Sequence, residues 1–532
     1  MTKDAGGDVR RSVGSRVPVL LALALTVSSC TLGAGKPDSF RPTFAPVNCP
    51  VEITSIVLVD VSCGRLTVLA HHDAPDRGTL DLFVARMEPG NRASAPDPVL
   101  YVGGDLAVAP DYTTLGAQVQ GLGREVIVLE GRGTGHSEPS LVCPEFDALP
   151  EPPVASPVDD PQTRTELLGG IGACRDRLTS EGVDLSAFDL REMAADAEDL
   201  RTALGIDQWN VMAFGTASRI ALEYLREDPA HVRAAVLDSP EWPGVDPFVE
   251  SVEATRHATA ALIATCAESD GCRRSAPHLG ADIRHVSQRL AARPLLVDAL
   301  NVRELRGTGK SGHVLFDPGW FLVWLRARLA GIRPPGTYVP HAIAEFARGS
   351  GRAMRLEATR LLDRQLCEGF LPSPCETQLV LSFGVYLSVM CRDVVPFTDP
   401  SSLNGLVADD PAFQEAYGHS PYLDACAVWD AGAGDPETAT PVHTDVPTLV
   451  LAGRFDPFGM PPYARRAMST LGSGTLLVSP VSGHQVTGTD EVPGSCMVRV
   501  RDGWLDQPTE EPNAPCIDRL HMDFSLPLDW NL

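Results

Sequence analysis

The stretch from Trp209 to Leu225 constrains the fold of this 532-residue chain more than any other. Its first half, through Phe214, is a short apolar run that predicts a buried β-strand. Its second half has helical spacing, with Ile220 among the residues of an inward face. Gly215 stands at the junction. A buried strand that turns directly into a helix is the unit of folds in which helices flank a sheet, so we expect an α/β fold.

Further short apolar runs extend this pattern. We expect strands at residues 53–59, 64–69, 80–87, 99–102, 125–129, 232–237, 448–453 and 475–478. Helical periodicity at residues 190–204 and 464–471 separates some of them. Strands that alternate with helices predict a mostly parallel sheet that is covered on both faces.

The alternation stops between residues 241 and 443, where the pattern is mainly helical with proline-rich breaks. This segment predicts a helical lid inserted into the sheet domain. We therefore expect the sheet domain to consist of residues 49–240 and residues 444–532.

The amino terminus has the pattern of an export signal. Basic residues precede an apolar run at residues 17–27, which is too short to span a bilayer comfortably. The run leads into Val27-Ser28-Ser29-Cys30, a bacterial lipoprotein cleavage box, so residues 1–29 predict a lipoprotein signal peptide with lipidation at Cys30. An ordinary cleaved signal peptide and a secreted protein are the alternative, and export by the general or the twin-arginine route stays open. Residues 30–48 predict a flexible tether.

Charge and cysteine content bound the possible partners. The formal net charge of -25 argues against nucleic-acid binding, which requires a basic face. Twelve cysteines remain after Cys30, and an even number behind an export signal predicts disulfides. Sequence neighbours can pair throughout, from Cys49 with Cys63 to Cys496 with Cys516, although the sequence does not establish the connectivity. No zinc motif of the Cys-x-x-Cys or His-Glu-x-x-His kind occurs, so we expect neither a metal nor a cofactor.

Several short motifs follow one another along the chain. They are Cys63-Gly64-Arg65-Leu66-Thr67-Val68, Arg132-Gly133-Thr134-Gly135-His136-Ser137, Cys174-Arg175-Asp176-Arg177-Leu178, Ala195-Asp196-Ala197-Glu198-Asp199-Leu200-Arg201, Leu237-Asp238-Ser239, and Pro447-Thr448-Leu449-Val450-Leu451-Ala452-Gly453-Arg454-Phe455-Asp456-Pro457. In this order they resemble the secreted bacterial tripeptidyl-aminopeptidase and prolyl-aminopeptidase group of α/β-hydrolases, which are serine exopeptidases. The resemblance covers nearly everything from Cys49 to Cys516. It implies an α/β-hydrolase fold with a lid and a carboxyl-terminal segment like that of tripeptidyl aminopeptidases.

The resemblance also implies a Ser, Asp and His triad in that chain order. Asp456 and His484 match the Asp and His positions, where the carboxylate would orient the imidazole and the imidazole would take the proton of the hydroxyl. The alternative is that Asp456 caps the following helix and that His484 bonds to backbone. The nucleophile position holds Gly215, within Ala213-Phe214-Gly215-Thr216-Ala217.

The residues that surround the nucleophile position, and the expected oxyanion loop, also differ from the family pattern. Ser218 is a poor substitute because it lies three residues, or about 4.5 Å, farther along the helix axis. Thr216 occupies the position whose backbone N–H normally serves the oxyanion. The expected oxyanion loop keeps Gly103 and Gly104 but continues with Asp105, whose charge opposes a developing oxyanion.

We therefore expect a catalytically impaired member of the family that binds a peptide or another ligand in the lid cleft. The alternatives are an active hydrolase, in which His484 and Asp456 use water or Ser218, and a purely structural envelope protein. Acidic lid residues such as Glu345 or Glu357 are candidates for holding a ligand's amino terminus. The only membrane contact that we expect is a lipid on Cys30, and the oligomeric state stays open.

Overall fold

A computed structural model describes residues 40–54, 59–90, 95–103, 106, 110–145, 155–298, 312–332, 337–368, 382–418, 421–487 and 495–524. Residues 41–532 form one compact unit. The expected signal peptide and Cys30 lie outside the described residues.

The centre of this unit is a nine-stranded sheet with the order β1-β2-β3-β5-β4-β6-β7-β10-β11. The strands are β1 (Thr43–Val47), β2 (Val59–Leu69), β3 (Thr79–Pro89), β4 (Ala95–Tyr101), β5 (Arg124–Leu129), β6 (Trp209–Phe214), β7 (Val232–Asp238), β10 (Thr448–Gly453) and β11 (Gly474–Ser479). The pairs β1–β2, β2–β3 and β3–β5 are antiparallel, whereas all pairs from β5 to β11 are parallel. The expected α/β-hydrolase fold with a mostly parallel sheet is confirmed.

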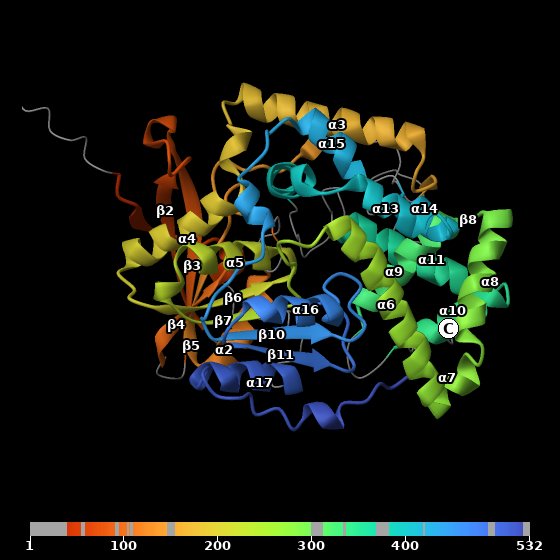
Figure 1. Cartoon of the computed structure of the whole chain (residues 1–532). Coiled ribbons are helices and arrows are strands. Elements are labelled where there is room, and N and C mark those ends of the chain that lie inside the picture. The colour runs from red at the N-terminus through yellow and green to blue at the C-terminus, as the bar shows by residue number, and fades with distance from the viewer. Residues whose placement is uncertain are drawn as a thin grey trace, which may run out of the picture. The chain divides into compact units, whose positions relative to one another are not determined.

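Helices cover both faces of the sheet (Figure 1). One face carries α2 (Tyr112–Leu122) and α17 (Cys496–Asp506), and the other carries α4 (Leu190–Leu204), α5 (Ser218–Glu227) and α16 (Pro461–Ala467). The central strand β6 serves both faces because successive side chains of a strand point to opposite sides. Val211 and Ala213 pack with α4 and α5, whereas Met212 and Phe214 pack with α2 and α17. All four are fully buried, which explains why the whole strand is apolar.

A mainly helical segment lies between β7 and β10, and the arrowheads of β10 and β11 point toward it in Figure 1. Its helices are α6 (Pro247–Glu268), α7 (Asp270–Ser275), α8 (Leu279–Ala292), α9 (Pro318–Ala330), α10 (Val339–Ala347), α11 (Gly351–Glu368), α12 (Phe383–Val389), α13 (Pro400–Val407), α14 (Pro411–Tyr417) and α15 (Pro421–Trp429). A hairpin of β8 (Leu295–Asp298) and β9 (His313–Phe316) was not predicted. The lid has its own core, in which Phe321, Trp324 and Phe346 pack ring against ring. Helix α3 (Pro161–Ser180), which precedes the lid, packs on α15.

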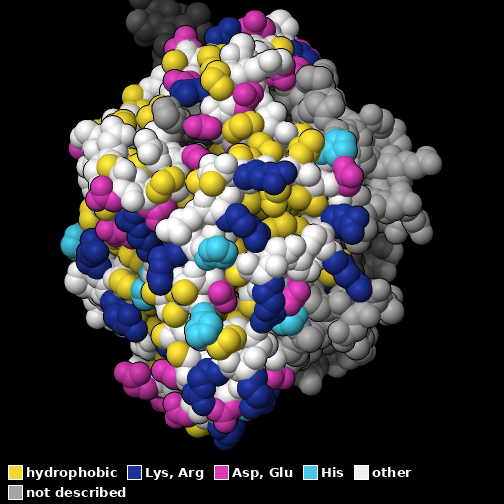
Figure 2. All heavy atoms as spheres, turned by 90° about the vertical axis from the view of Figure 1, so that its right-hand side faces the viewer, with side chains coloured by type: hydrophobic (Ala, Val, Ile, Leu, Met, Phe, Trp, Pro, Cys, Tyr) yellow, Lys and Arg dark blue, Asp and Glu magenta, His cyan; other side chains and the backbone are white. Residues whose placement is uncertain are grey.

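Positively charged side chains lie on the lid side of the molecule. Figure 2 shows arginine and histidine side chains spread over this face, with acidic side chains among them. Exposed arginines of α7 and α8 include Arg273, Arg274 and Arg284.

Two details near the amino terminus correct the sequence-based expectations. Residues 43–47, expected within a flexible tether, form the edge strand β1. The ring of Phe44 occupies the space above Gly64, where any Cβ would lie 2.1 Å from the ring. The short helix α1 (Val51–Thr54) also replaces the start of a strand that we expected at residues 53–59.

Disulfides join neighbouring cysteines, as the spacing allowed. The five described pairs are Cys49–Cys63, Cys143–Cys174, Cys266–Cys272, Cys391–Cys426 and Cys496–Cys516. A pairing of Cys367 with Cys375 involves residues whose side chains lie outside the described part.

Candidate active site

The turn between β6 and α5 has a backbone conformation that disfavours side chains. Gly215 has φ +51° and opens a single 3₁₀ turn, Gly215–Ala217, before α5 begins at Ser218. An L-residue in this region is strained by about 1–2 kcal/mol. The turn thus has the sharp geometry of a nucleophile-bearing turn, but glycine occupies it without strain.

Asp456 and His484 lie in hydrogen-bond contact, because they follow the carboxyl ends of the adjacent parallel strands β10 and β11. His484 Nδ1 is 3.1 Å from both carboxylate oxygens of Asp456. Asp456, just after β10, is fully buried and also accepts hydrogen bonds from the backbone N–H groups of Phe458 and Gly459. The backbone N–H of His484 donates to the carbonyl of Ala330 in the lid. Asp456 therefore pairs with His484 and closes the turn at Phe458 and Gly459, but it does not cap the following helix, because the N-cap of α16 is Met460.

These contacts set the charge of Asp456. Burial alone would raise its pKa, but the neighbouring His484 and the two backbone donors hold the pKa below its ordinary value. A carboxylate that stays ionised can fix the imidazole with Nδ1 protonated, so that Nε2 is the nitrogen able to accept a proton.

The imidazole faces the position where a nucleophile's side chain would begin. A Cβ built on Gly215 would lie 3.2 Å from His484 Nε2 and 3.6 Å from Gln485 Nε2. The base is therefore aimed at Gly215, which has no hydroxyl to activate.

Two hydroxyl groups lie near Gly215, those of Ser218 and Thr216, and their surroundings differ. Ser218 is fully buried, and its Oγ has no hydrogen-bond partner among the described residues. Thr216 Oγ1 accepts a hydrogen bond from the backbone N–H of Leu106 at 3.0 Å. This bond ties the turn after β6 to the loop after β4. Because a substrate carbonyl cannot reach a fully buried hydroxyl without rearrangement, the structure does not favour Ser218 as a replacement nucleophile.

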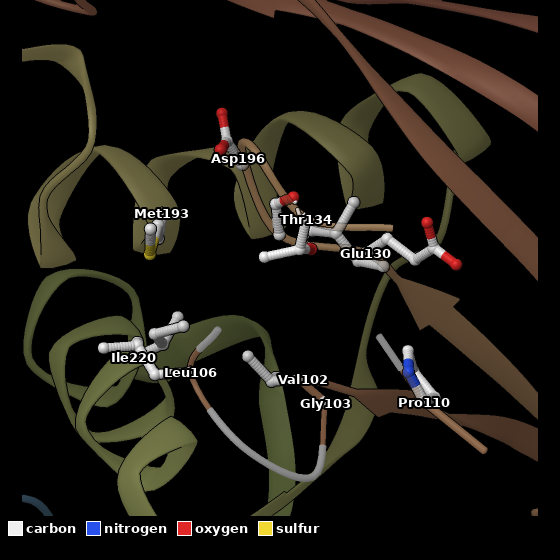
Figure 3. Close-up of a pocket in the computed structure, with 11 residues that line it drawn as sticks. Val102, Gly103, Leu106, Pro110, Glu130, Thr134, Met193, Asp196 and Ile220 are labelled. Carbon is white, nitrogen blue, oxygen red and sulfur yellow. Dashed lines mark hydrogen bonds between the residues drawn. The ribbon is translucent and has the colours of Figure 1, made fainter. Parts of the chain in front are cut away.

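The expected oxyanion region borders a small pocket, shown in Figure 3. Gly103, with φ +81°, and Leu106 line it together with Ile220 of α5. Gly104 and Asp105 lie outside the described residues. The acidic side chains at the pocket wall have partners: Glu130 accepts from Tyr112, and Asp196 pairs with the buried Arg132. These carboxylates therefore stabilise the surrounding loops.

Two acidic residues beside the turn were not predicted. The backbone N–H of Glu241 donates to the carbonyl of Gly215, and its carboxylate accepts from Arg219 at 2.9 Å. Glu250, in the first turn of α6, is 3% exposed, and its Oε1 has no hydrogen-bond partner among the described residues. Burial and then the charge of Glu241 raise the pKa of Glu250 well above its ordinary value. The position of Glu241 just after a strand was the only signal in the sequence.

The lid acids that we singled out have other roles. Glu345 pairs with Arg348. Glu357 is fully buried and pairs with Arg328 and Arg360, while Trp324 donates to it. These contacts make Glu357 the polar centre of the lid core.

The loop after His484 is fixed by the end of β7. Asp238 is fully buried and accepts from the backbone N–H groups of Val486 and Thr487. Ser239 Oγ accepts from the backbone N–H of Gln485 at 2.8 Å. The Leu237-Asp238-Ser239 motif therefore positions the histidine loop.

Among the described residues, three groups of His, Cys, Asp or Glu are close enough together to hold a metal ion, and neither Asp456 nor His484 belongs to any of them. In the same part of the chain, every helix is too short or too polar to cross a membrane.

Comparison with known families gives two matches. Residues 97–317 match the alpha/beta hydrolase fold, and residues 410–516 match the TAP-like protein family. Together these regions include more than half of the chain.

Curated relatives include the serine protease Hip1 of Mycobacterium tuberculosis and of Mycobacterium bovis. Each is 26% identical over 234 residues, which cover 41% of this chain and 43% of the relative. The match therefore spans less than half the length of these relatives.

Solved structures with a similar chain path include two hydrolases. Proline iminopeptidase of Mycobacterium smegmatis is 13% identical with a TM-score of 0.35, covering 81% of this chain and 96% of that one. A thermophilic esterase of Thermogutta terrifontis is 14% identical with a TM-score of 0.35, covering 84% and 99%.

Proposed function

Since this chain belongs to the α/β-hydrolases with a TAP-like carboxyl-terminal region, we propose that it binds a peptide beside Gly215 and does not cleave it through an acyl-enzyme. The observation that carries this proposal is the glycine at which His484 Nε2 is aimed. In a serine protease, loss of the nucleophile lowers turnover on the order of a millionfold. The altered oxyanion loop reduces the remaining capacity further.

The ligand chemistry follows from Glu241 and Glu250. Arg219 engages one oxygen of Glu241, which is about a quarter exposed, while Glu250 is buried and has no cationic hydrogen-bond partner among the described residues. A positively charged amino terminus would supply the missing charge, since a buried carboxylate requires a paired cation. The relatives named as serine proteases support a peptide as the ligand.

The binding reaction should depend on pH. Because the pKa of Glu250 is raised, this group must lose a proton before it can pair with an ammonium group. Binding should therefore release a proton and should tighten as the pH rises, until the amino terminus itself loses its charge near pH 8 or so.

The test compares tripeptides that carry a free or an acetylated amino terminus. We expect the free form to bind about 10–100-fold more tightly by calorimetry, the range for hydrogen bonds to charged groups. Glu241→Gln and Glu250→Gln should remove this preference, and Glu345→Gln is the matched control because Glu345 pairs with Arg348. Equal binding of both peptide forms would refute the amine site.

The absence of acyl-enzyme chemistry has its own test. The wild-type protein should remain unlabelled by a fluorophosphonate in intact-mass measurements and should not hydrolyse aminoacyl-peptide substrates. Stoichiometric labelling together with hydrolysis would overturn the proposal.

A second candidate is hydrolysis by a water molecule that His484 activates. The preserved contact with Asp456 favours it, because this contact prepares Nε2 to accept a proton. His484→Ala should then abolish any measured hydrolysis, and activity unchanged by this substitution would eliminate the candidate.

We also propose that the protein acts outside the cytoplasm, held by a lipid on Cys30. The five disulfides support an oxidising compartment. Mass spectrometry of the mature amino terminus should find a diacylated Cys30, and Cys30→Ala should release the protein from membranes. A mature chain that begins elsewhere would exclude the anchor.

A further inference from the structure

A second polar cluster lies where the chain leaving β2 meets the first turn of α4. A ring nitrogen of His71 and carboxylate oxygens of Asp73 and Glu192 all lie within 4.8 Å of one another. His71 Nδ1 is 3.9 Å from Glu192 Oε1. We propose that these three side chains form a binding site for Zn²⁺.

The surroundings of His71 prepare one nitrogen for a metal. The residue is 6% exposed, and its Nε2 lies 3.1 Å from Asp184 Oδ2. A neutral imidazole that donates Nε2–H to this carboxylate carries its lone pair on Nδ1. Among the described residues, Nδ1 has no hydrogen-bond partner. A carboxylate on the far nitrogen is the arrangement that orients most metal-binding histidines.

The two carboxylates complete the ligand set from separate elements. Asp73 is exposed and makes no ion pair with a described residue, so its side chain is able to turn toward a metal. Glu192 is held in place by Arg132 and by His72, whose Nδ1 lies 2.5 Å from it. Zn²⁺ binds imidazole nitrogen and carboxylate oxygen at about 2.0–2.2 Å, so small side-chain rotations would close the observed spacing, and water would fill the open position.

The local charge also favours a dication. Five carboxylates gather here, those of Asp73, Asp184, Glu192, Asp196 and Asp199. Two arginines, Arg77 and Arg132, oppose them. The carboxylates at this site therefore outnumber the arginines, which favours a bound cation.

The nitrogen ligand selects the kind of metal. Ca²⁺ and Mg²⁺ prefer oxygen ligands alone, whereas imidazole suits Zn²⁺. No short sequence motif contains this site, because Glu192 lies more than a hundred residues from His71 and Asp73.

The experiment uses the exported chain without a histidine tag, treated with a chelator and then titrated with Zn²⁺ against a chromogenic competitor. We expect one equivalent to bind and to raise the melting temperature. Asp73→Asn tests the site without a folding risk, since Asp73 is exposed, and it should weaken binding at least tenfold. His71→Ala should abolish binding, and Asp184→Asn should weaken it about 10–100-fold through the orientation of His71.

His285→Ala is the matched control, because His285 is an exposed histidine of α8. It should leave Zn²⁺ binding unchanged. The proposal is overturned if the wild type binds no Zn²⁺ at low micromolar concentration. It is also overturned if Asp73→Asn and His71→Ala bind as the wild type does, or if Ca²⁺ binds as tightly as Zn²⁺.

Discussion

Replacing Gly215 by serine restores the missing hydroxyl directly beneath His484. The new residue must adopt φ +51°, which costs about 1–2 kcal/mol. Its Cβ would lie 3.2 Å from His484 Nε2, so the imidazole must retreat by a few tenths of an ångström. We expect Gly215→Ser to fold with a free energy of unfolding lowered by about 1–3 kcal/mol. Gly215→Ala introduces the same Cβ and the same strain, so it should show the same loss.

The two variants should differ in reactivity. Loss of a nucleophile costs on the order of 10⁶ and loss of an oxyanion donor about 10²–10³, so Gly215→Ser should gain on the order of 10³–10⁴ in turnover over the wild type. The assay is the rate of fluorophosphonate labelling followed by intact mass, with aminoacyl-peptide hydrolysis measured in parallel. Gly215→Ala should not be labelled, and adding His484→Ala to Gly215→Ser should abolish labelling.

A further variant tests whether the expected oxyanion loop limits the reactivity of Gly215→Ser. Adding Asp105→Gly should accelerate labelling of Gly215→Ser, because it removes a negative charge from the expected oxyanion loop. Suppose that Gly215→Ser is as stable as Gly215→Ala, but that neither Gly215→Ser nor Gly215→Ser with Asp105→Gly is labelled. His484 and Asp456 would then not be able to activate a serine at this position. The assignment of their triad positions would then be refuted.

Three further predictions concern stability. His72→Gln should lower the free energy of unfolding by about 3 kcal/mol at pH 6, because the pKa of His72 is about 9 in the folded protein and about 6.5 in the unfolded chain. Denaturant titrations at several pH values should show that this loss disappears as the pH rises through about 9. A loss that stays constant with pH would contradict the prediction. Arg132→Met should cost about 3–5 kcal/mol because Asp196 is left buried without its partner. Adding Asp196→Leu should restore only part of this loss, because the backbone carbonyls that Arg132 served stay without a donor. Replacing Cys391 and Cys426 by serine opens a loop with a sequence separation of 35 and should cost about 4 kcal/mol in chemical denaturation, whereas an unchanged midpoint would show that the bond does not constrain the unfolded chain.

The sequence is most predictive where burial is complete. The runs at residues 209–214 and 448–453 are apolar at nearly every position, because both faces of these central strands are covered. The edge of the sheet was misjudged. Residues 43–47, Thr-Phe-Ala-Pro-Val, are mostly exposed and include a proline, which is disfavoured inside a sheet. They form a strand because they pair with β2 and because the ring of Phe44 fits over Gly64.

Some residues of the candidate site could also be predicted from the sequence, whereas others could not. Asp456 and His484 could be placed because each follows a strand within a motif, and the structure brings their side chains into contact. Glu250 could not be found from the sequence. Its importance comes from its burial near the charge of Glu241 and from the lack of a hydrogen-bond partner for Oε1 among the described residues, and the local sequence indicates neither of these.

The position of the Cys49–Cys63 bond has a mechanical consequence. Strand β1 pairs with β2 from Thr43 opposite Thr67 to Val47 opposite Cys63, and the disulfide follows immediately. A force that pulls on the chain ahead of residue 43 would peel β1 away one pair at a time. The peeling would stop at Cys49, where the load passes through a covalent bond into β2. Detachment of this short edge strand can therefore absorb a pull while the rest of the sheet stays closed.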